Sequence, residues 1–374
     1  MIPVNRPLVY SKNNKEIEKS LGLRWISGDG PIVKKFEKKF SEIIGSKFAV
    51  TVSNGTAALE VALAALKLKP GSKVIVPNLT IISCLNAILR NNLEPVFVDV
   101  NKNDFNICIL DLKKKINKNI KAMIMVHTYG LPSNIKEIML LKKKFNFKII
   151  EDCAEGLGLK YKNKFLGRYG DLSIFSFYSN KLITTGEGGC ILTDSTKYYR
   201  TCMNLRNLSF GEKERFKHRH LSGNYRLSSL QCAFGISQLE HFYSHIIKKK
   251  KIGSMYDKRL KKKTFIQRPL ISNEISENIY WVYPIVIKKK GEISKQSFIK
   301  FMNSKGVATR DFFYPLSMQP LLKKFNIKKK LLKNSNFLYK NALYLPSGLG
   351  NTFAEIKKVC DFIDLYEKKF IKKK

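Results

Sequence analysis

The chain has 374 residues, of which 44% are hydrophobic, and its 69 Lys and Arg residues outnumber its 29 Asp and Glu residues, for a formal net charge of +40. This hydrophobic share is too high for a chain kept disordered by its charge. We therefore expect a folded protein with one large domain and a smaller companion, or with two to three domains.

The basic residues occur as short lysine runs spread along the chain, such as 248–251 and 328–330. A nucleic-acid site is predicted by basic residues gathered on one element with aromatic residues among them, and these runs lack that pattern. We interpret the runs as a solvated surface and expect no nucleic-acid partner.

Composition also bears on compartment and metal chemistry. No window holds the roughly 18 apolar residues that cross a bilayer, and residues 1–10 lack the layout of a signal peptide. We therefore expect a cytoplasmic protein without a membrane span. The seven cysteines are scattered and form no C-x-x-C pair, so we expect neither a disulfide framework nor a metal site.

Between about Ser46 and Asp194, short β-branched runs alternate with helical patterns. The strand candidates are KFAVTVS, KVIVP, PVFVDV, KAMIMVH, FKIIEDC, DLSIFSF and GCILTD. Apolar strands that alternate with helices predict an α/β fold, with a mostly parallel sheet between helices. Ligands of such sheets bind at the carboxyl ends of the strands.

After about Phe242 the pattern changes to Lys-rich helical stretches around strand candidates such as YWVYPIVI, and it ends in a helical pattern from Phe353 to Phe370. This pattern predicts a smaller α+β domain. We place the large domain, with the N-terminal segment, at residues 1–245 and the small C-terminal domain at residues 246–374.

Two polar elements follow predicted strands. Residues 53–56 (SNGT) lie where the first strand passes into a helix, and free backbone N–H groups there favour a phosphate. An ordinary helix cap is an equal alternative. Glu151 and Asp152 end the strand FKII, where a carboxylate could hold a protonated ring nitrogen. The alternative for this pair is a helix cap or a buried pair.

Lys181 is the third element. At the chain's average, residues 169–196 would hold about five basic residues, but Lys181 is the single one there. It follows LSIFSF and precedes the glycine-rich turn 184–189. Burial lowers the pKa of a lysine amine and makes it nucleophilic toward carbonyl carbons. A structural lysine with its charged end in water is the alternative.

A phosphate site, a carboxylate for a pyridinium nitrogen and a lysine for a Schiff base are the three groups that hold pyridoxal phosphate. The chain resembles the sugar-nucleotide aminotransferases of the DegT/StrS type, which are fold type I pyridoxal-phosphate enzymes. Nearly the whole chain carries the resemblance, in the motifs WISGDGPIVKKFE, SNGTAALEVAL, VIVPNLT, EPVFVDV, VHTYG, IIEDCAEGLG, GDLSIFSFYSNKLITTGEGG, GNYRLSSLQCAFGISQLE and GVATRDFFYPL.

The resemblance implies a role for individual residues at the cofactor. Lys181 would be the Schiff-base lysine and proton shuttle, and Asp152 the partner of the pyridine nitrogen. The remaining implied contacts are Gly55, Thr56 and Ser176 at the phosphate, Glu155 at the ring hydroxyl, and Asn224, which family members donate to the phosphate of a neighbouring subunit. The resemblance therefore implies a homodimer.

On the substrate side, the resemblance implies that Arg310 and Tyr314 face the nucleotide-sugar, with Arg310 suited to its diphosphate. Two positions depart from close relatives. Ile81 replaces an aromatic residue that stacks on the cofactor ring, which implies weaker stacking. Asp311 stands where relatives often have Pro, which puts the geometry of the loop near Arg310 in doubt.

The motifs GVATRDFFYPL and ENIYWVYPI most resemble the perosamine-synthase-like 4-aminotransferases. We expect transfer of an amino group from L-glutamate to the 4-keto group of a nucleotide-linked 4-keto-6-deoxyhexose, for a surface polysaccharide such as O-antigen. The alternatives within the family are a 3-aminotransferase or a UDP- or dTDP-sugar 4-aminotransferase. A related sugar dehydratase would carry histidine at Lys181, and a regulatory or nucleic-acid-binding protein would need neither Lys181 nor Asp152.

Overall fold

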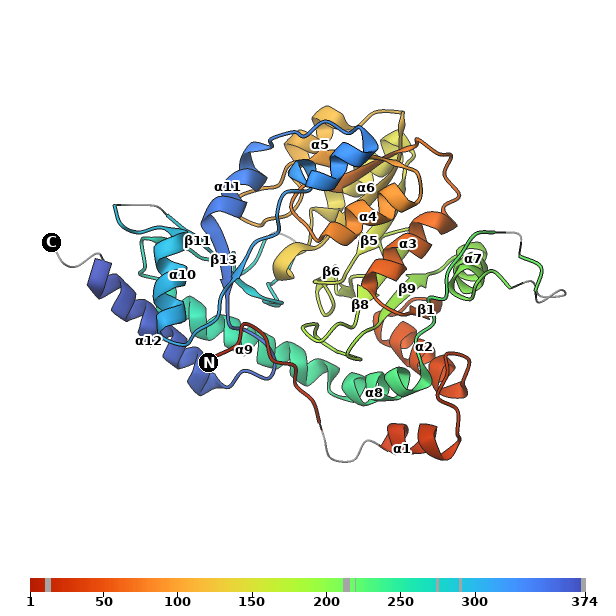
Figure 1. The fold of residues 1–374 in the computed structure, drawn as a ribbon, viewed down its shortest axis with the longest axis horizontal. Helices are drawn as coiled ribbons and strands as arrows, with labels where there is room; N and C mark the ends of the chain where they lie inside the picture. Colours follow the sequence, from red (N-terminus) through yellow and green to blue (C-terminus); the bar gives the residue numbers. More distant parts are fainter. Residues whose placement is uncertain (11–14, 211–215, 219, 274–275, 289–290, 371–374) are drawn as a thin grey trace.

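The computed structural model describes residues 1–10, 15–210, 216–218, 220–273, 276–288 and 291–370 (Figure 1). Its main sheet has seven strands. From one edge to the other these are β1 (Phe48–Val52), β9 (Gly189–Thr193), β8 (Leu172–Ser176), β5 (Lys148–Asp152), β4 (Ile120–Val126), β2 (Lys73–Pro77) and β3 (Glu94–Val98). Each of the seven predicted strand segments supplies one of them.

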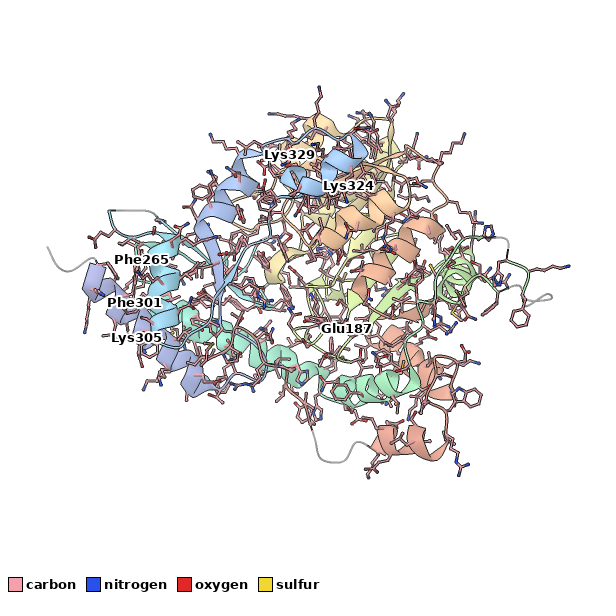
Figure 2. The ribbon with its side chains drawn as sticks, in the orientation of Figure 1. Glu187, Phe265, Phe301, Lys305, Lys324 and Lys329 are labelled. Carbon is pink, nitrogen blue, oxygen red and sulfur yellow. The ribbon has the colours of Figure 1, made fainter. Side chains whose placement is uncertain are left out.

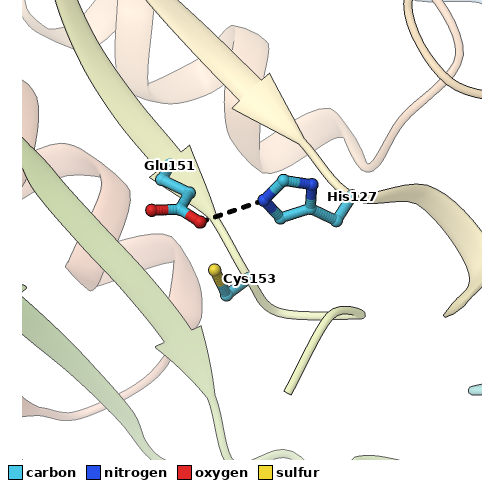
Figure 3. A group of neighbouring side chains, drawn as sticks. All are labelled: His127, Glu151 and Cys153. Atoms are coloured by element: carbon cyan, nitrogen blue, oxygen red, sulfur yellow. Dashed lines mark hydrogen bonds and ion pairs between the residues drawn. The ribbon is translucent and has the colours of Figure 1, made fainter. Parts of the chain in front are cut away.

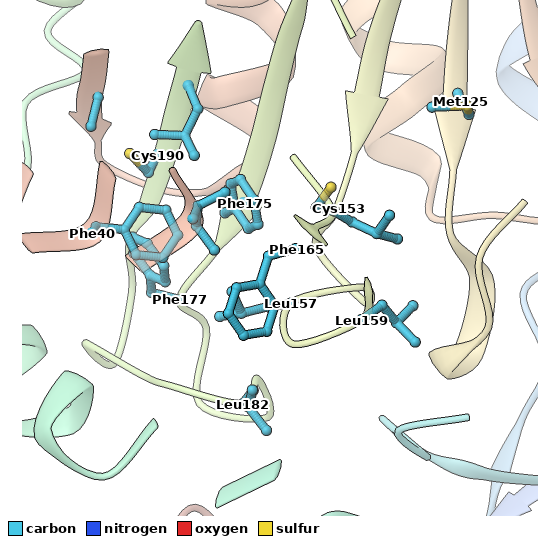
Figure 4. Packing of buried hydrophobic residues seen from close by; sticks show 14 of the residues in the cluster. Phe40, Met125, Cys153, Leu157, Leu159, Phe165, Phe175, Phe177, Leu182 and Cys190 are labelled. Atoms are coloured by element: carbon cyan, nitrogen blue, oxygen red, sulfur yellow. The ribbon is translucent and has the colours of Figure 1, made fainter. Parts of the chain in front are cut away.

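Side chains that follow one another in a strand point to opposite faces of the sheet, and each face is buried in its own core. In β5, Ile149 belongs to one core and Ile150 to the other. In β8, Phe175 lies in the first core, where its ring meets the edge of Phe40 at a centroid distance of 5.0 Å (Figure 4). This alternation explains why the strands read as continuous apolar runs.

Helices cover both faces. The first core is covered by α2 (Pro31–Ile44), α5 (Ile109–Lys115), α6 (Ile135–Phe145) and α8 (Ser229–Glu240), and the second by α3 (Gly55–Ala65), α4 (Ile82–Arg90) and α7 (Thr196–Arg206). This arrangement confirms the predicted α/β fold with a mostly parallel sheet between helices.

β9 runs antiparallel to both of its neighbours, whereas the other pairs of the sheet are parallel. Parallel neighbours need a long crossover, usually a helix, but β8 and β9 are joined by residues 177–188, which contain no helix. The sequence analysis did not predict this reversal. Because of it, the loop that contains Lys181 both begins and ends at the edge of the sheet where β8 ends.

A second sheet is antiparallel and has four strands. In sheet order these are β10 (Ile266–Gln267), β11 (Tyr283–Ile287), β13 (Ala342–Leu345) and β12 (Arg310–Asp311). Its core is shared with α9 (Phe242–Leu260), α10 (Lys295–Ser304) and α12 (Phe353–Phe370). The last helix has the bounds that the sequence predicted. The shorter elements are α1 (Lys15–Gly22), η1 (Thr128–Gly130), β6 (Lys160–Tyr161), β7 (Lys164–Phe165), η2 (Leu316–Met318), η3 (Pro320–Phe325) and α11 (Lys333–Asn341).

The predicted domain boundary, between residues 245 and 246, falls inside α9, which is one continuous helix. Two segments also cross between the parts of the chain. Ile2 forms a parallel bridge with Val307, and Leu316 is buried in the core beside α3 and α4. The boundary stays a prediction, and the crossing segments tie the small sheet to the large domain.

The lysine runs contribute to the outer surface. Lys329 is labelled in Figure 2, and its run 328–330 is exposed along its whole length. In the run 248–251, however, Lys249 is buried. Our interpretation of the runs as a solvated surface therefore holds at 328–330 and is wrong at Lys249. Within the part of the chain that the structure describes, no helix combines the length and the apolar character needed to cross a membrane.

Candidate active site

A cavity of about 860 Å³ lies where the carboxyl ends of the large-domain strands meet β12 of the small sheet. Eight of the nine predicted site residues line this cavity: Gly55, Thr56, Asp152, Glu155, Ser176, Lys181, Asn224 and Arg310. Tyr314 is the ninth, and it is not among the lining residues. The sequence therefore located the cavity from segments that lie up to 255 positions apart in the chain (Gly55 to Arg310).

One end of the cavity is built on the start of α3. Asn54 is the N-cap, and its side-chain oxygen accepts a hydrogen bond from the backbone N–H of Ala57 at 2.8 Å. A Cβ atom added to Gly55 would lie 2.9 Å from the Cβ atom of Ser176. Glycine is therefore required at this close approach of α3 to β8. The remaining free N–H groups of the helix start form a place for an anion.

A second helix begins at the same place. Thr56 and Ser83, near the starts of α3 and α4, join their hydroxyl oxygens by a hydrogen bond of 2.7 Å. Both residues line the cavity. Ser83 was not singled out from the sequence, where it is one polar residue in a helical pattern. Its position after the strand KVIVP is the signal that could have identified it, because that strand also ends at this edge of the sheet.

Asp152 ends β5 and is buried beside the cavity. Its Oδ1 accepts the backbone N–H of Ala154 at 3.0 Å, and its Oδ2 lies 3.4 Å from the thiol sulfur of Cys84. Burial raises the pKa of Asp152, although the N–H of Ala154 and the charge of Lys181 oppose this effect. A positive group bound at Oδ2 would therefore relieve an unfavourable buried charge.

Glu151 points to the other face of the sheet and has a structural environment. His127 Nδ1 accepts the backbone N–H of Ser133 at 3.1 Å, so its Nε2 carries the proton and donates to Glu151 at 3.1 Å (Figure 3). Further donors to this carboxylate are the N–H groups of Gly167, Tyr169 and Gly170 and the hydroxyl of Ser173. Burial by itself raises the pKa of Glu151, but these hydrogen bonds and His127 bring it down to about 2.

Figure 3 also shows Cys153 beside this pair, so that three buried side chains with possible metal ligands lie close together. The two oxygens of Glu151 already accept two and three hydrogen bonds. Burial and the neighbouring carboxylates raise the pKa of Cys153 well above its usual value, which keeps its thiol protonated. The cluster is therefore explained as a hydrogen-bond network of the core.

Glu155 and Lys181 interact through their charges in the cavity. Glu155 is buried and accepts the backbone N–H of Tyr129 at 2.9 Å. Burial raises the pKa of Glu155 to about 7, although the charge of Lys181 and the N–H of Tyr129 oppose this effect. Burial also lowers the pKa of Lys181, with Glu155 and Asp152 acting in the opposite direction. The Lys181 amine lies 4.2 Å from the ring centroid of Trp281, a second residue that the sequence analysis did not single out.

The small sheet also contributes residues to the cavity. Arg310 in β12 lines the cavity and is exposed to it. Asp311, the departure from the family pattern, forms an ion pair with Lys295 at 2.9 Å. This carboxylate therefore has a partner on α10. Tyr314 packs its ring edge against Tyr339 at a centroid distance of 5.0 Å, on the surface beyond the cavity lining.

Ile81 and Asn224 also line the cavity. Ile81, the second departure, lines the cavity at the start of α4 with 39% of its surface exposed. Asn224 is exposed, forms an isolated bridge with Asn207 and lines the cavity of its own chain. Its predicted contribution to a neighbouring subunit stays a prediction.

Comparison with known proteins decides the family. The model of the DegT/DnrJ/EryC1/StrS aminotransferase family matches residues 8–364. The chain belongs to this family. It is 33% identical to the GDP-perosamine synthase of Escherichia coli O157:H7 over 97% of this chain and 98% of the relative, and 32% identical to that of Vibrio cholerae over 98% and 99%. This membership makes the protein an aminotransferase that depends on pyridoxal 5'-phosphate.

Solved structures agree with the fold. An aminotransferase of Helicobacter pylori involved in the biosynthesis of pseudoaminic acid superposes with a TM-score of 0.91 at 23% identity, covering 98% of this chain and 99% of the other. The Escherichia coli GDP-4-keto-6-deoxy-D-mannose-3-dehydratase with bound hydrated pyridoxal phosphate superposes with a TM-score of 0.85 at 26% identity, covering 96% and 99%. The fold is therefore one on which more than one sugar chemistry occurs.

The cavity fits pyridoxal 5'-phosphate on three observations. Gly55 and Thr56 line the cavity at the start of α3, where backbone N–H groups can bind an anion. Asp152 Oδ2 is approached by the Cys84 thiol and by no N–H or O–H donor of the described residues. The amine of Lys181 opens into the same cavity. These are places for a phosphate, a protonated ring nitrogen and an aldehyde carbon, respectively.

The raised pKa of Glu155 predicts a specific pH dependence of stability in the cofactor-free protein. Between the usual carboxyl value of 4.5 and about 7, the folded state holds a proton that the unfolded state has lost, so stability falls as the pH rises. Glu155→Gln removes this loss. We expect its melting temperature, relative to the wild type, to rise by roughly 2–6 °C between pH 5 and pH 8.

Thermal denaturation of both proteins at the two pH values measures this change. Glu292→Gln, which alters an exposed glutamate of the small domain, is the matched control and should follow the wild type. A constant difference between Glu155→Gln and the wild type across the pH range would show that Glu155 titrates like an ordinary carboxyl group.

Proposed function

We propose that this aminotransferase moves an amino group from L-glutamate to the 4-keto group of a GDP-linked 4-keto-6-deoxyhexose. The observation that carries the proposal is one cavity that joins the helix start at Gly55, Asp152 and Lys181 to Arg310 of the small sheet. Similarity to two GDP-perosamine synthases over nearly the whole chain supports the 4-amino product and the GDP carrier. In the proposal, the reaction takes place in the cytoplasm and supplies a surface polysaccharide such as O-antigen.

When bound, pyridoxal 5'-phosphate supplies an aldehyde that takes up an amino group and a ring that withdraws electrons from the substrate carbon. Asp152 keeps the ring nitrogen protonated, because a positive partner stabilises the negative charge of its buried carboxylate. The start of α3 at Gly55 and Thr56, with Ser176, holds the phosphate. Glu155 binds the ring hydroxyl.

Lys181 attaches the cofactor and then moves protons. Burial lowers the pKa of this amine and so increases its neutral share, which can accept a proton from the substrate carbon and donate it to the cofactor carbon C4′. The same amine serves both halves of the reaction. Arg310, which lines the same cavity, holds the diphosphate of the sugar substrate as a bidentate cation.

The proposed active unit is a homodimer. The segment before α2 exposes four large apolar side chains: Leu21, Leu23, Trp25 and Ile26. This segment contacts the one that contains Asn224, because Ser27 accepts the backbone N–H of Ser229 at 3.0 Å. Exposed apolar side chains of this kind are typical of a surface that a second subunit covers. The proposal assigns Asn224 to the phosphate of that subunit.

The reaction itself is tested with the purified protein, pyridoxal 5'-phosphate, L-glutamate and a panel of GDP-, UDP- and dTDP-linked 4-keto-6-deoxyhexoses. We expect a 4-amino sugar from the GDP substrate, identified by mass and NMR, and a loss of about 10³-fold or more in Lys181→Ala. Borohydride reduction should fix the cofactor to a peptide that contains Lys181. A label on another lysine, or turnover of none of the sugars, would refute the assignment.

Arg310 should act in the sugar half of the reaction and not in the glutamate half. Arg310→Ala should slow the sugar half by about 10- to 100-fold, the loss expected for hydrogen bonds to a charged group, and leave the glutamate half within about twofold. Single-turnover absorbance of each half measures both rates. Equal damage to both halves would mean that Arg310 acts on the cofactor or the fold.

The composite site is tested by subunit exchange. Asn224→Ala and Lys181→Ala should each be impaired alone and recover about a quarter of the wild-type activity when mixed, because one site of a mixed dimer has both native residues. Sedimentation reports the oligomeric state. A fully active monomer, or a mixture no more active than its components, would contradict the proposed dimer.

A further inference from the structure

Trp281 lies against the amine on which the proposed chemistry depends. It precedes β11, lines the cavity and is only 5% exposed. The amine of Lys181 lies 4.2 Å from the centroid of its ring, within the range of a cation–π interaction. An ammonium group in this position is stabilised by the negative face of the indole, and a neutral amine gains much less.

The indole is held from three sides. Its Nε1–H donates to the backbone carbonyl of Asn180, the neighbour of Lys181, at 3.1 Å. The backbone carbonyl of Trp281 accepts a hydrogen bond from the buried amine of Lys249 at 2.8 Å. Its ring is nearly parallel to that of Tyr129, at an interplanar angle of 7° and a centroid distance of 6.2 Å. The ring therefore keeps one orientation toward the lysine.

Tyr280, the residue before Trp281, has an unusual backbone conformation. Tyr280 has a φ of 51°, which bulky residues rarely adopt, and its hydroxyl is bound by Asp257. A Cβ atom on Gly253 of α9 would lie 2.2 Å from the Tyr280 ring, so only glycine leaves room for it. Strain of this kind persists where surrounding contacts over-determine the position, often at functional sites.

The charged groups around the Lys181 amine act in both directions. Asp152 and Glu155 favour the ammonium form and burial disfavours it. Arg310 lines the same cavity, and its positive charge opposes a second one. Lys249 lines a small cavity shared with Lys181, and burial lowers the pKa of Lys249 to about 7, so this amine opposes the ammonium form of Lys181 mainly at lower pH. The π face of Trp281 adds a neutral group that favours the ammonium form.

We propose that Trp281 is a catalytic residue of the proton transfer, whose indole face receives the ammonium form of Lys181 whenever this amine is not bonded to the cofactor. The inference rests on the proposed function, in which Lys181 is the proton shuttle. In that step the amine takes one proton from the substrate carbon, becomes an ammonium and returns to the amine when it passes this proton to C4′.

The test uses the full-length protein without cofactor, to which pyridoxal 5'-phosphate is added at a series of pH values. Because only the neutral amine attacks the aldehyde, the rate of cofactor attachment, followed by absorbance, rises through the pKa of Lys181. Trp281→Leu should move the midpoint of this rise to lower pH. Trp281→Phe keeps a ring but loses the N–H, and should leave the midpoint near that of the wild type.

The glutamate half-reaction gives a second measurement. Its rate should fall by about 3- to 30-fold in Trp281→Leu, as expected for a desolvated cation–π contact, and by less in Trp281→Phe. Thermal denaturation checks folding, and Trp281→Met offers a larger apolar side chain if the leucine variant is unstable. Phe337→Leu, which removes a cation–π contact with Lys102 at an exposed position, is the matched control.

The outcomes separate this inference from the proposed function. Normal attachment at Lys181 with the same pH midpoint in wild type, Trp281→Leu and Trp281→Met would overturn the role of Trp281 alone. An equal change in Trp281→Phe and Trp281→Leu would assign the effect to the N–H bond at Asn180 and overturn the role of the ring. Absence of attachment at Lys181 in the wild type would overturn the proposed function and this inference with it.

Discussion

The end of β5 is the constraint on which the site depends. Glu151 and Asp152 are adjacent, so their carboxylates point to opposite faces of the sheet. Glu151 is saturated by hydrogen bonds and holds the loop after β7 and the loop around His127 against the core. Asp152 keeps an oxygen that no N–H or O–H donor of the described residues reaches. One carboxylate therefore stabilises the strand end, and the other is available to a ligand.

The cavity also depends on how the small sheet packs against the large one. Lys181 lies on a loop of the large domain, whereas Arg310 and Trp281 approach it from the small sheet. The bridge between Ile2 and Val307 and the burial of Leu316 tie these two parts together. The electrostatic environment of the amine is therefore set by packing between segments about 100 residues apart. A change in that packing would alter both substrate binding and the protonation of Lys181.

The isolation of Lys181 in a very basic chain has a physical reason. Strands β8 and β9 on either side of its loop are almost entirely buried, and a buried lysine without a partner is costly. Lysines are therefore absent from these strands and abundant on helix ends and loops, where water solvates them. The one lysine that remains has Asp152 and Glu155 as neighbours, which offset the cost of burying its charge.

The sequence by itself determined the α/β class, the seven strands of the main sheet, the last helix, and the positions of Asp152, Lys181 and the start of α3. These follow from local periodicity and from residues placed directly after strands, and such features need no knowledge of distant contacts. Only the tertiary structure decided that β9 is antiparallel, that Ser83 and Trp281 line the cavity, that Glu151 is saturated, and that Tyr314 lies outside the lining. Each of these depends on which distant segments meet in space. The residue pattern of one segment does not determine the segment against which it packs.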